Sequence, residues 1–197
     1  MADASAEQLD QEVGALLERG AVDEAASLAI RRLGPSILGW LRAVIRDADD
    51  ADDAFARFAE SLWSSLRGFR RECSLKTWTH RLAWQAALRI LEDPYRRRRE
   101  ALPTTEATRI AAEVRSRTSL ARDADEAARV ERLRRALAPE EQTMIILRFD
   151  RGLSWSEVAE VLAAGGERPD EAALRKRFER LKKRLRELAI AEGLLDG

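Results

Sequence analysis

Basic and aromatic side chains alternate along residues 69–89, a combination that suits contacts with nucleic acid. The basic residues are Arg70, Arg71, Lys76, Arg81 and Arg89, and the aromatic ones are Phe69, Trp78 and Trp84. Lysine and arginine neutralise phosphates, while aromatic faces stack on unpaired bases. An arginine run at 96–99 follows. We interpret the set as a surface for single-stranded or melted nucleic acid. Taken alone, Trp78 is one helical turn from Leu82, a spacing that favours packing of its side chain in the core or at its edge.

Basic side chains also gather on a predicted C-terminal helix. Its apolar stripe consists of Leu174, Phe178, Leu181, Leu185 and Leu188. At 100° per residue, Lys176, Lys183 and Arg186 lie opposite this stripe, and Arg175, Arg177, Arg180, Lys182 and Arg184 flank it. Eight basic residues against three acidic ones between 171 and 187 favour DNA binding over a coiled-coil or bundle helix, which the stripe alone fits equally.

Catalytic and metal-binding side chains are scarce. The chain has one histidine, His80, and one cysteine, Cys73, which excludes an intramolecular disulfide, Cys-rich zinc sites and multi-histidine metal cages. We expect His80 to lie on the surface or to face DNA, and Cys73 to serve ordinary packing. The sequence therefore predicts no enzyme, no metal, no cofactor and no small-molecule substrate.

The elements that must position these residues are predicted to be helices. The 197 residues are 36% charged and 45% hydrophobic, with only 10 Gly and 5 Pro. Abundant Ala, Leu, Arg and Glu favour an all-α fold. Two short helices are expected at 7–19 and 22–33, the second ending at Gly34-Pro35 because proline interrupts a helix. Residues 1–33 are interpreted as a helical N-terminal extension.

Two helices with apolar faces are expected next. Ile37, Leu41, Val44 and Ile45 mark the first, and Phe55, Phe58, Leu62, Trp63 and Leu66 mark the second. Between them, residues 47–53 hold five acidic side chains in seven positions. Capping needs fewer, so we favour a surface that meets a basic partner over plain solvation. A loop at 69–74 and a helix from 75 to about 91 follow, and residues 100–127 predict a linker with a helical turn or more near 109–115.

The C-terminal segment carries three signals for helix starts. Pro139, followed by two glutamates, opens one helix, Ser154 and Glu157 form a capping box, and Asp170 caps the basic helix. A short capped helix before a long basic one predicts a helix-turn-helix, whose second helix enters the major groove of DNA. The turn at 163–169 has seven residues, more than the usual three or four.

The formal net charge of zero hides large opposite terms. The net charge is −7 over residues 1–66, +6 over 67–100, +2 over 101–138, −4 over 139–170 and +3 over 171–197. A chain without surplus positive charge should bind free DNA weakly. No apolar stretch predicts export or membrane insertion, so we expect no membrane association and a cytoplasmic location.

In their order and spacing these segments resemble an extracytoplasmic-function (ECF) type RNA polymerase sigma factor of the sigma-70 family. The resemblance covers roughly residues 34–190. It rests on DADDAFARFAESLW, FRRECSLKTWTHRLAWQAALRIL, LAPEEQTMIILRFDRGLSWSEVAEVL and LRKRFERLKKRLREL. It implies a region 2 domain at 34–99, a linker at 100–127 and a region 4 helix-turn-helix domain at 128–197.

The resemblance implies a transcription initiation factor whose partners are core RNA polymerase and promoter DNA, with an anti-sigma factor as a further candidate partner. Region 2 would dock on the clamp helices of the polymerase and region 4 on its flap. The implied polymerase contacts are Asp52, Asp53, Phe55, Arg57 and Trp63. The implied contacts that capture and melt the −10 element are Phe69, Arg70, Arg71, Cys73, Ser74, Lys76, Trp78 and Arg81. The implied contacts to the −35 element are Arg175, Lys176, Arg177, Arg180 and Lys183.

Three features depart from the family pattern. Gln85 and Arg89 stand where the family usually has Asn and Asp in the promoter-melting helix, so an amide is kept at the first position and a positive charge is added at the second. Ala56 and Arg57 stand where the family usually has Gln and an acidic residue, which changes the charge of the docking helix. The long turn at 163–169 could displace the recognition helix or bring Gly165-Gly166 to DNA or a partner. Two other functions stay open: a stand-alone dimeric helix-turn-helix regulator, which would need two half-sites, and a helical adaptor that has lost promoter binding.

Overall fold

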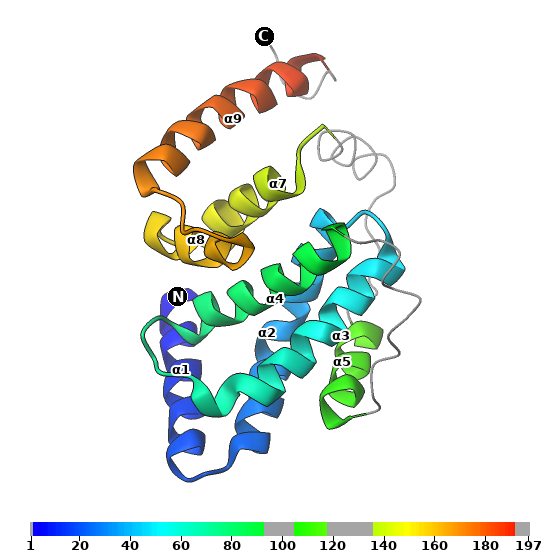
Figure 1. Ribbon diagram of the computed structural model, residues 1–197, viewed down its shortest axis with the longest axis vertical. Coiled ribbons are helices and arrows are strands. Elements are labelled where there is room, and N and C mark those ends of the chain that lie inside the picture. The colour runs from blue at the N-terminus through cyan, green and yellow to red at the C-terminus, as the bar shows by residue number, and fades with distance from the viewer. Residues whose placement is uncertain (1, 93–104, 118–135, 192–197) are drawn as a thin grey trace. The chain divides into compact units, whose positions relative to one another are not determined.

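The computed structural model describes residues 2–92, 105–117 and 136–191, and every regular element in these ranges is a helix (Figure 1). The chain divides into two compact units, Met1–Ser119 and Leu120–Gly197. The arginine run at 96–99 and most of the expected linker lie outside the described residues. The all-helical prediction is confirmed for the described residues.

The first unit is built around two central helices, α2 (Val22–Val44) and α3 (Ala48–Ser65). Around them pack α1 (Ala2–Glu18), α4 (Leu75–Glu92) and α5 (Glu106–Arg117), and a short 3₁₀ turn, η1 (Leu66–Gly68), ends α3. Fully buried side chains of the core include Ile30, Ile37, Leu38, Leu41, Phe55, Phe58, Leu62, Leu66, Leu75 and Ile110. The predicted apolar faces of α2 and α3 are therefore confirmed, except that Trp63 is only half-buried.

Helix α2 does not end at Gly34-Pro35, as the sequence analysis expected, but runs through it to Val44. Proline usually excludes helical backbone at the preceding residue because its ring clashes with that residue's N–H and Cβ. Gly34 has no Cβ, which relieves part of the clash. Gly34 is buried against Phe55 and Val114, so packing with α3 and α5 offsets the backbone hydrogen bond that Pro35 cannot donate.

The expected linker also has more structure than its sequence suggested. Helix α5 covers residues 106–117, and its residues Ala107, Ile110, Ala111 and Val114 are buried against α2 and α3. Positions 107, 110, 111 and 114 follow the three-to-four spacing of a helix face. Because alanine fills two of these positions, the stripe has little hydrophobic bulk and was easily overlooked in the sequence.

The second unit consists of α7 (Pro139–Ile145), a π-helical turn η3 (Ile146–Asp150), α8 (Trp155–Leu162), a 3₁₀ turn η4 (Ala163–Gly165) and α9 (Glu171–Ala191). Helix α9 packs against α8 and α7, burying Leu174, Phe178 and Leu181. All three predicted helix starts are confirmed. Ser154 Oγ accepts a hydrogen bond from the Glu157 amide at 3.2 Å, and Asp170 Oδ1 accepts one from the Ala173 amide at 2.9 Å.

Candidate functional site

The two aromatic residues of the loop and the start of α4 lie face to face. The ring centroids of Phe69 and Trp78 are 4.9 Å apart and the ring planes are tilted by 33°. Both side chains are half-buried rather than sealed in the core. A tilted pair at this distance is a favourable aromatic contact. Because both side chains keep part of their surface exposed, the pair is a candidate for stacking with an unpaired base.

Helix α4 begins directly after the loop and is capped by loop residues. Ser74 Oγ accepts a hydrogen bond from the Thr77 amide at 3.1 Å and lies 2.9 Å from Thr77 Oγ1. Ser74 and its neighbour Cys73 are half-buried. These positions indicate that Ser74 has a local structural role, whatever else it contacts.

The predicted basic residues of this segment divide into two groups. Arg70 and Arg81 are exposed, and Arg70 forms only a long ion pair of 3.8 Å with Glu72 while remaining 82% exposed. Lys76 is half-buried at the helix start. Arg71 is exposed as well, but it is bound by another helix: its Nη2 donates to Glu18 Oε1 of α1 at 3.2 Å.

His80 is not on the surface, which corrects the expectation from the sequence. Its side chain is 1% exposed, Nδ1 lies 2.7 Å from the Lys76 carbonyl oxygen, and its ring centroid is 5.3 Å from that of Trp40. Thr77 and Thr79 are likewise buried in α4. The polar types of these residues suggested an outer face, but α4 packs against both α2 and α3, so a wide sector of it is covered.

The residues expected to contact polymerase lie on α3 in different environments. Asp52 Oδ1 accepts a hydrogen bond from Arg42 Nη2 at 3.0 Å, and Oδ2 lies 3.7 Å from Arg115 Nε, so this carboxylate joins α2, α3 and α5. Phe55 is fully buried and can support a docking surface only from beneath. The half-buried members of the set are Asp52, Asp53, Arg57 and Trp63.

The basic residues of α9 also separate by environment. Arg175, Lys176, Arg180 and Lys183 are exposed. Arg177 is instead half-buried, and its Nη1 lies 2.5 Å from Glu140 Oε1 of α7. Two helical turns further along α9, Arg184 Nη2 lies 2.6 Å from Glu141 Oε2 of α7. Arg177 and Arg184 therefore hold α9 on α7, and Arg175, Lys176, Arg180 and Lys183 form an exposed basic surface.

The glutamate of the second pair has a shifted pKa. Burial of the Glu141 carboxyl works against its ionisation, but the hydrogen bond from the Ala138 amide and the guanidinium groups of Arg184 and Arg177 outweigh it. The pKa of Glu141 consequently lies below its usual value. A charged Glu141 thus contributes to the contact between α7 and α9 through its ion pair with Arg184.

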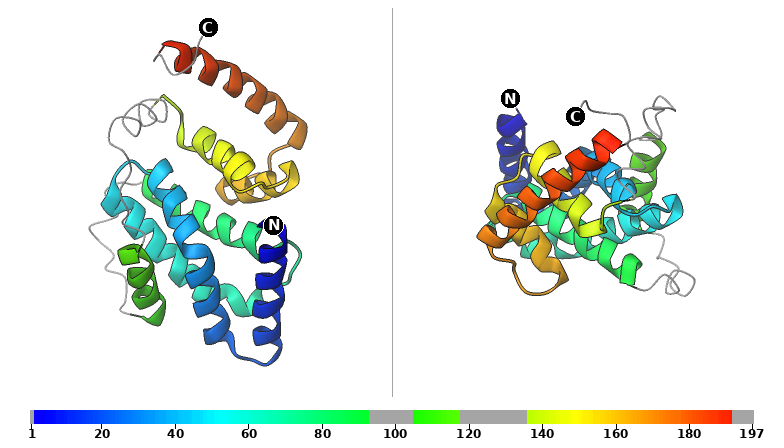
Figure 2. Two further views of the ribbon diagram at one scale, coloured as in Figure 1. Left: turned by 180° about the vertical axis from the view of Figure 1, so that it is seen from behind. Right: turned by 90° about the horizontal axis from the view of Figure 1, so that it is seen from above.

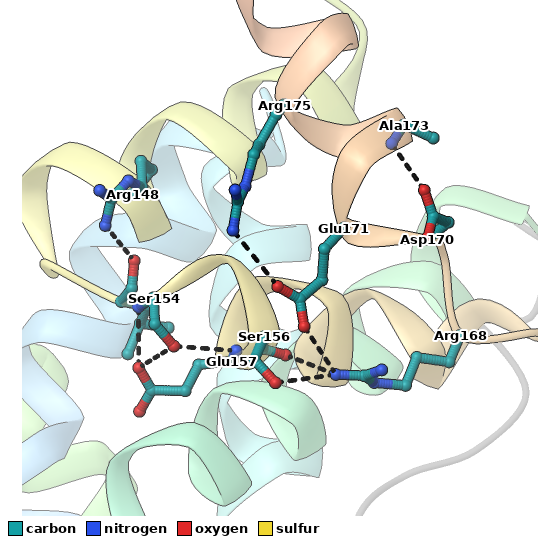
Figure 3. Close-up of polar contacts among 10 residues, drawn as sticks. Arg148, Ser154, Ser156, Glu157, Arg168, Asp170, Glu171, Ala173 and Arg175 are labelled. Carbon is teal, nitrogen blue, oxygen red and sulfur yellow. Dashed lines mark hydrogen bonds and ion pairs between the residues drawn. The ribbon is translucent and has the colours of Figure 1, made fainter.

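The long turn between α8 and α9 is tied down by Arg168 (Figure 3). Its Nη2 donates to Ser156 Oγ of α8 at 2.9 Å and lies 3.7 Å from Glu171 Oε1 of α9. Glu171 in turn lies 3.6 Å from Arg175 through its other carboxylate oxygen. The extra length of the turn is accommodated by these contacts, which fix the first turn of α9 relative to α8.

Three sets of structurally important residues were missed by the sequence analysis. In the sequence Arg168 could not be distinguished from the other exposed charged residues, and only its hydrogen bond to Ser156 shows that it holds the turn at 163–169 on α8. Phe149, next to the predicted helix of α7, is 64% exposed, with its ring centroid 5.3 Å from that of Phe178. On α1, Asp10 and Glu18 contact the loop at 69–74 or the start of α4. Asp10, Gly14 and Glu18 follow one another at intervals of four residues and so share a face of α1, and this spacing was visible in the sequence.

No helix within the described ranges is long and apolar enough to cross a membrane. In comparisons with known proteins, residues 29–100 match the family Sigma-70 region 2. No curated protein matches the chain. The match begins in α2, includes the acidic run, the Phe69–Trp78 pair and all of α4, and extends to residue 100. Sigma factors bind core RNA polymerase in transcription initiation and are not enzymes.

Proposed function

We propose that this chain, of which residues 29–100 match the family Sigma-70 region 2, acts in transcription initiation as an ECF-type sigma factor. In this proposal it binds core RNA polymerase, recognises the −35 element and melts the −10 element. Residues 34–99 form its polymerase- and −10-binding domain, and residues 128–197 its −35-binding helix-turn-helix domain. The observation that carries the proposal is the accessible Phe69–Trp78 pair inside the matched region, flanked by exposed arginines.

Melting needs a surface that binds unpaired bases better than stacked base pairs. Stacking on an aromatic side chain contributes about 1–3 kcal/mol per base. The Phe69–Trp78 pair offers such a surface, and Arg70, Lys76 and Arg81 can neutralise the neighbouring phosphates. No covalent bond is made or broken; binding of the open strand shifts the duplex equilibrium toward the open state.

The exposed residues of α9 are the proposed contacts to the −35 element. Arg175, Lys176, Arg180 and Lys183 lie on the side of α9 that neither α7 nor α8 covers. Arginine can donate two hydrogen bonds to guanine in the major groove, and lysine can bind phosphate or base. Arg177 acts in this proposal by fixing α9 on α7 through Glu140.

The α3 face supports the proposed docking on the polymerase clamp helices. Asp52, Asp53, Arg57 and Trp63 are the half-buried residues of α3 available for direct contact, and Asp52 is also bound by Arg42. Phe55 supports this face from within the domain. Region 4 docking on the flap and control by an anti-sigma factor belong to the same proposal as expectations from the family resemblance.

Transcription with purified core polymerase on a genomic promoter library tests the proposal. Three reactions are compared: core alone, the chain alone, and both together. New transcript start sites only in the combined reaction support a sigma factor. A chain that neither creates start sites nor binds core polymerase is not one, and a dimer that binds paired half-sites without polymerase would indicate the stand-alone regulator instead.

Substitution of exposed α9 residues tests the site assignment on a promoter from that library. Lys176→Ala plus Arg180→Ala should lower −35-dependent initiation by about tenfold or more because base and phosphate contacts are lost. The control Arg19→Ala plus Arg32→Ala removes the same charge from exposed positions of the first unit and should leave initiation unchanged. Equal losses in both variants would refute the assignment of α9 as the −35 reader.

A further inference from the structure

Helix α1 contacts Leu75 at the start of α4 and Arg71 of the candidate base-binding loop from positions spaced by one helical turn: Asp10, Gly14 and Glu18. Residues four apart lie on one face of a helix, so this face of α1 is turned toward the loop. Figure 2 shows, in the view from behind, the segment between η1 and α4 passing alongside α1. Helix α1 precedes the residues that match region 2.

Asp10 fixes the point at which the loop becomes helix. Its Oδ2 accepts a hydrogen bond from the Leu75 amide, the first amide of α4, at 3.2 Å. Burial raises the pKa of Asp10, against the opposing effects of this hydrogen bond and of the Arg71 charge. The Leu75 amide has no hydrogen-bond acceptor within α4, because it belongs to the first turn of the helix. By accepting from it, the Asp10 carboxylate links α1 to the N-terminus of α4.

Arg71 is held on the same face of α1. Its φ of 59° is the only positive φ of a non-glycine residue in the described part of the chain, a conformation that persists only where surrounding contacts maintain it. The contact is the 3.2 Å hydrogen bond from Nη2 to Glu18 Oε1. The guanidinium crosses α1 at Gly14, where a Cβ would lie 2.1 Å from Nη2. A side chain at position 14 would therefore displace the guanidinium from this place.

We infer that α1 positions the loop at 69–74 through Asp10, Gly14 and Glu18, and that Arg71 is a positioning residue rather than a phosphate contact. Its consequence for base binding rests on the proposed function. It replaces the expectation from the sequence that Arg71 contacts the −10 element. The loop that carries Phe69 is then held in a conformation set by α1, outside the region 2 match.

The single cysteine of the chain, Cys73, provides a probe of the loop in the full-length protein. Its rate of reaction with a thiol reagent such as dithionitrobenzoate reports loop opening. Gly14→Ala should displace the guanidinium and raise this rate roughly fivefold, while alanine in α1 maintains or increases helix stability. The control Gly39→Ala, at an exposed position of α2 with no neighbour within 4 Å, should leave the rate unchanged. Identical rates for Gly14→Ala and wild type would overturn the inference.

Salt dependence distinguishes positioning from phosphate contact. Binding of the holoenzyme to a single-stranded −10 oligonucleotide should weaken with salt, with a slope that falls by about 0.7 for each phosphate contact removed. Arg70→Ala should reduce this slope. Arg71→Ala should weaken binding at every salt concentration with the slope unchanged, and a reduced slope would show that Arg71 contacts phosphate.

The two experiments separate this inference from the proposed function. Faster thiol reaction in Gly14→Ala supports positioning of the loop by α1 even if no promoter is transcribed, in which case the sigma factor proposal alone fails. If the wild type initiates transcription normally but Cys73 reacts at the same rate in Gly14→Ala as in the wild type, the role of α1 is refuted and the sigma factor proposal stands.

Discussion

Gly34 and Gly39 lie on the same helix, α2, but their surroundings differ. A Cβ on Gly34 would lie 3.1 Å from Phe55 Cζ and 3.2 Å from Val114 Cγ1, whereas one on Gly39 would meet nothing within 4 Å. Gly34→Leu should therefore destabilise the protein by about 1–3 kcal/mol through overpacking, together with the clash of its Cβ with the Pro35 ring. Gly39→Leu should stabilise it by about 0.5–1 kcal/mol because glycine is a poor helix former.

Urea unfolding followed by circular dichroism measures both changes. The pair is matched, because both substitutions add the same side chain to the same helix. Equal effects of the two substitutions would mean that the contact among α2, α3 and α5 is looser than the distances at Gly34 indicate.

The residue types in the sequence predicted the helix caps correctly, but they predicted less well which side chains are buried. Ser154 and Asp170 cap helices as expected because such hydrogen bonds are local in sequence. The burial of His80 and the ion pair of Arg177 depend on which other helices cover α4 and α9, and no pattern within a single helix contains that information.

At the scale of elements, the contact between α7 and α9 should depend on pH through Glu141. Its pKa is lowered in the folded state, so its ionisation stabilises the fold above its unfolded-state pKa, and this stabilisation is lost as pH falls through the folded-state value. Glu141→Gln should thus be less stable than wild type near pH 7 and nearly equal to it at about pH 3.

Urea unfolding of the full chain at both pH values provides the measurement, and Glu7→Gln, on the exposed side of α1, is the control. A stability difference between wild type and Glu141→Gln that stays constant between the two pH values would contradict the role of the charged carboxylate.

Helix positions were largely predictable from the sequence, and helix ends at unusual residues were not. The sequence indicated the apolar faces of α2, α3 and α9 because large side chains recur at helical spacing. It placed a break at Pro35, where tertiary packing of Gly34 overrides the local preference. It also gave too little structure to α5, whose buried face contains small residues, and it left α1 without a role.

For the whole molecule, zero net charge predicts weak binding to duplex DNA in the absence of polymerase. Fluorescence anisotropy with a labelled promoter duplex should give a dissociation constant of about 10⁻⁶ M or weaker at physiological salt for the chain alone. With core polymerase present, binding should become much tighter and specific for the promoter. Tight, sequence-specific binding by the chain alone would favour the stand-alone regulator.

The order of segments along the chain was more informative about function than any single motif. Acidic and basic segments, the aromatic-basic loop and the capped C-terminal helices each have ordinary structural explanations. Together they indicated a sigma factor, and the match of residues 29–100 to Sigma-70 region 2 supports the first part of that sequence-based interpretation. The sequence could not distinguish Arg70 from Arg71, because the two arginines differ only in their folded contacts.

The central claim is that this chain and core polymerase together open promoter DNA at the −10 element. Permanganate reactivity of non-template thymines measures this opening directly on a promoter from the transcription library. We expect reactive thymines at the −10 element with core polymerase and the chain together, none with either alone, and strongly reduced reactivity for Trp78→Ala because a stacking surface is lost. Unreactive thymines in the combined reaction, or full reactivity in the Trp78→Ala complex, would contradict the account.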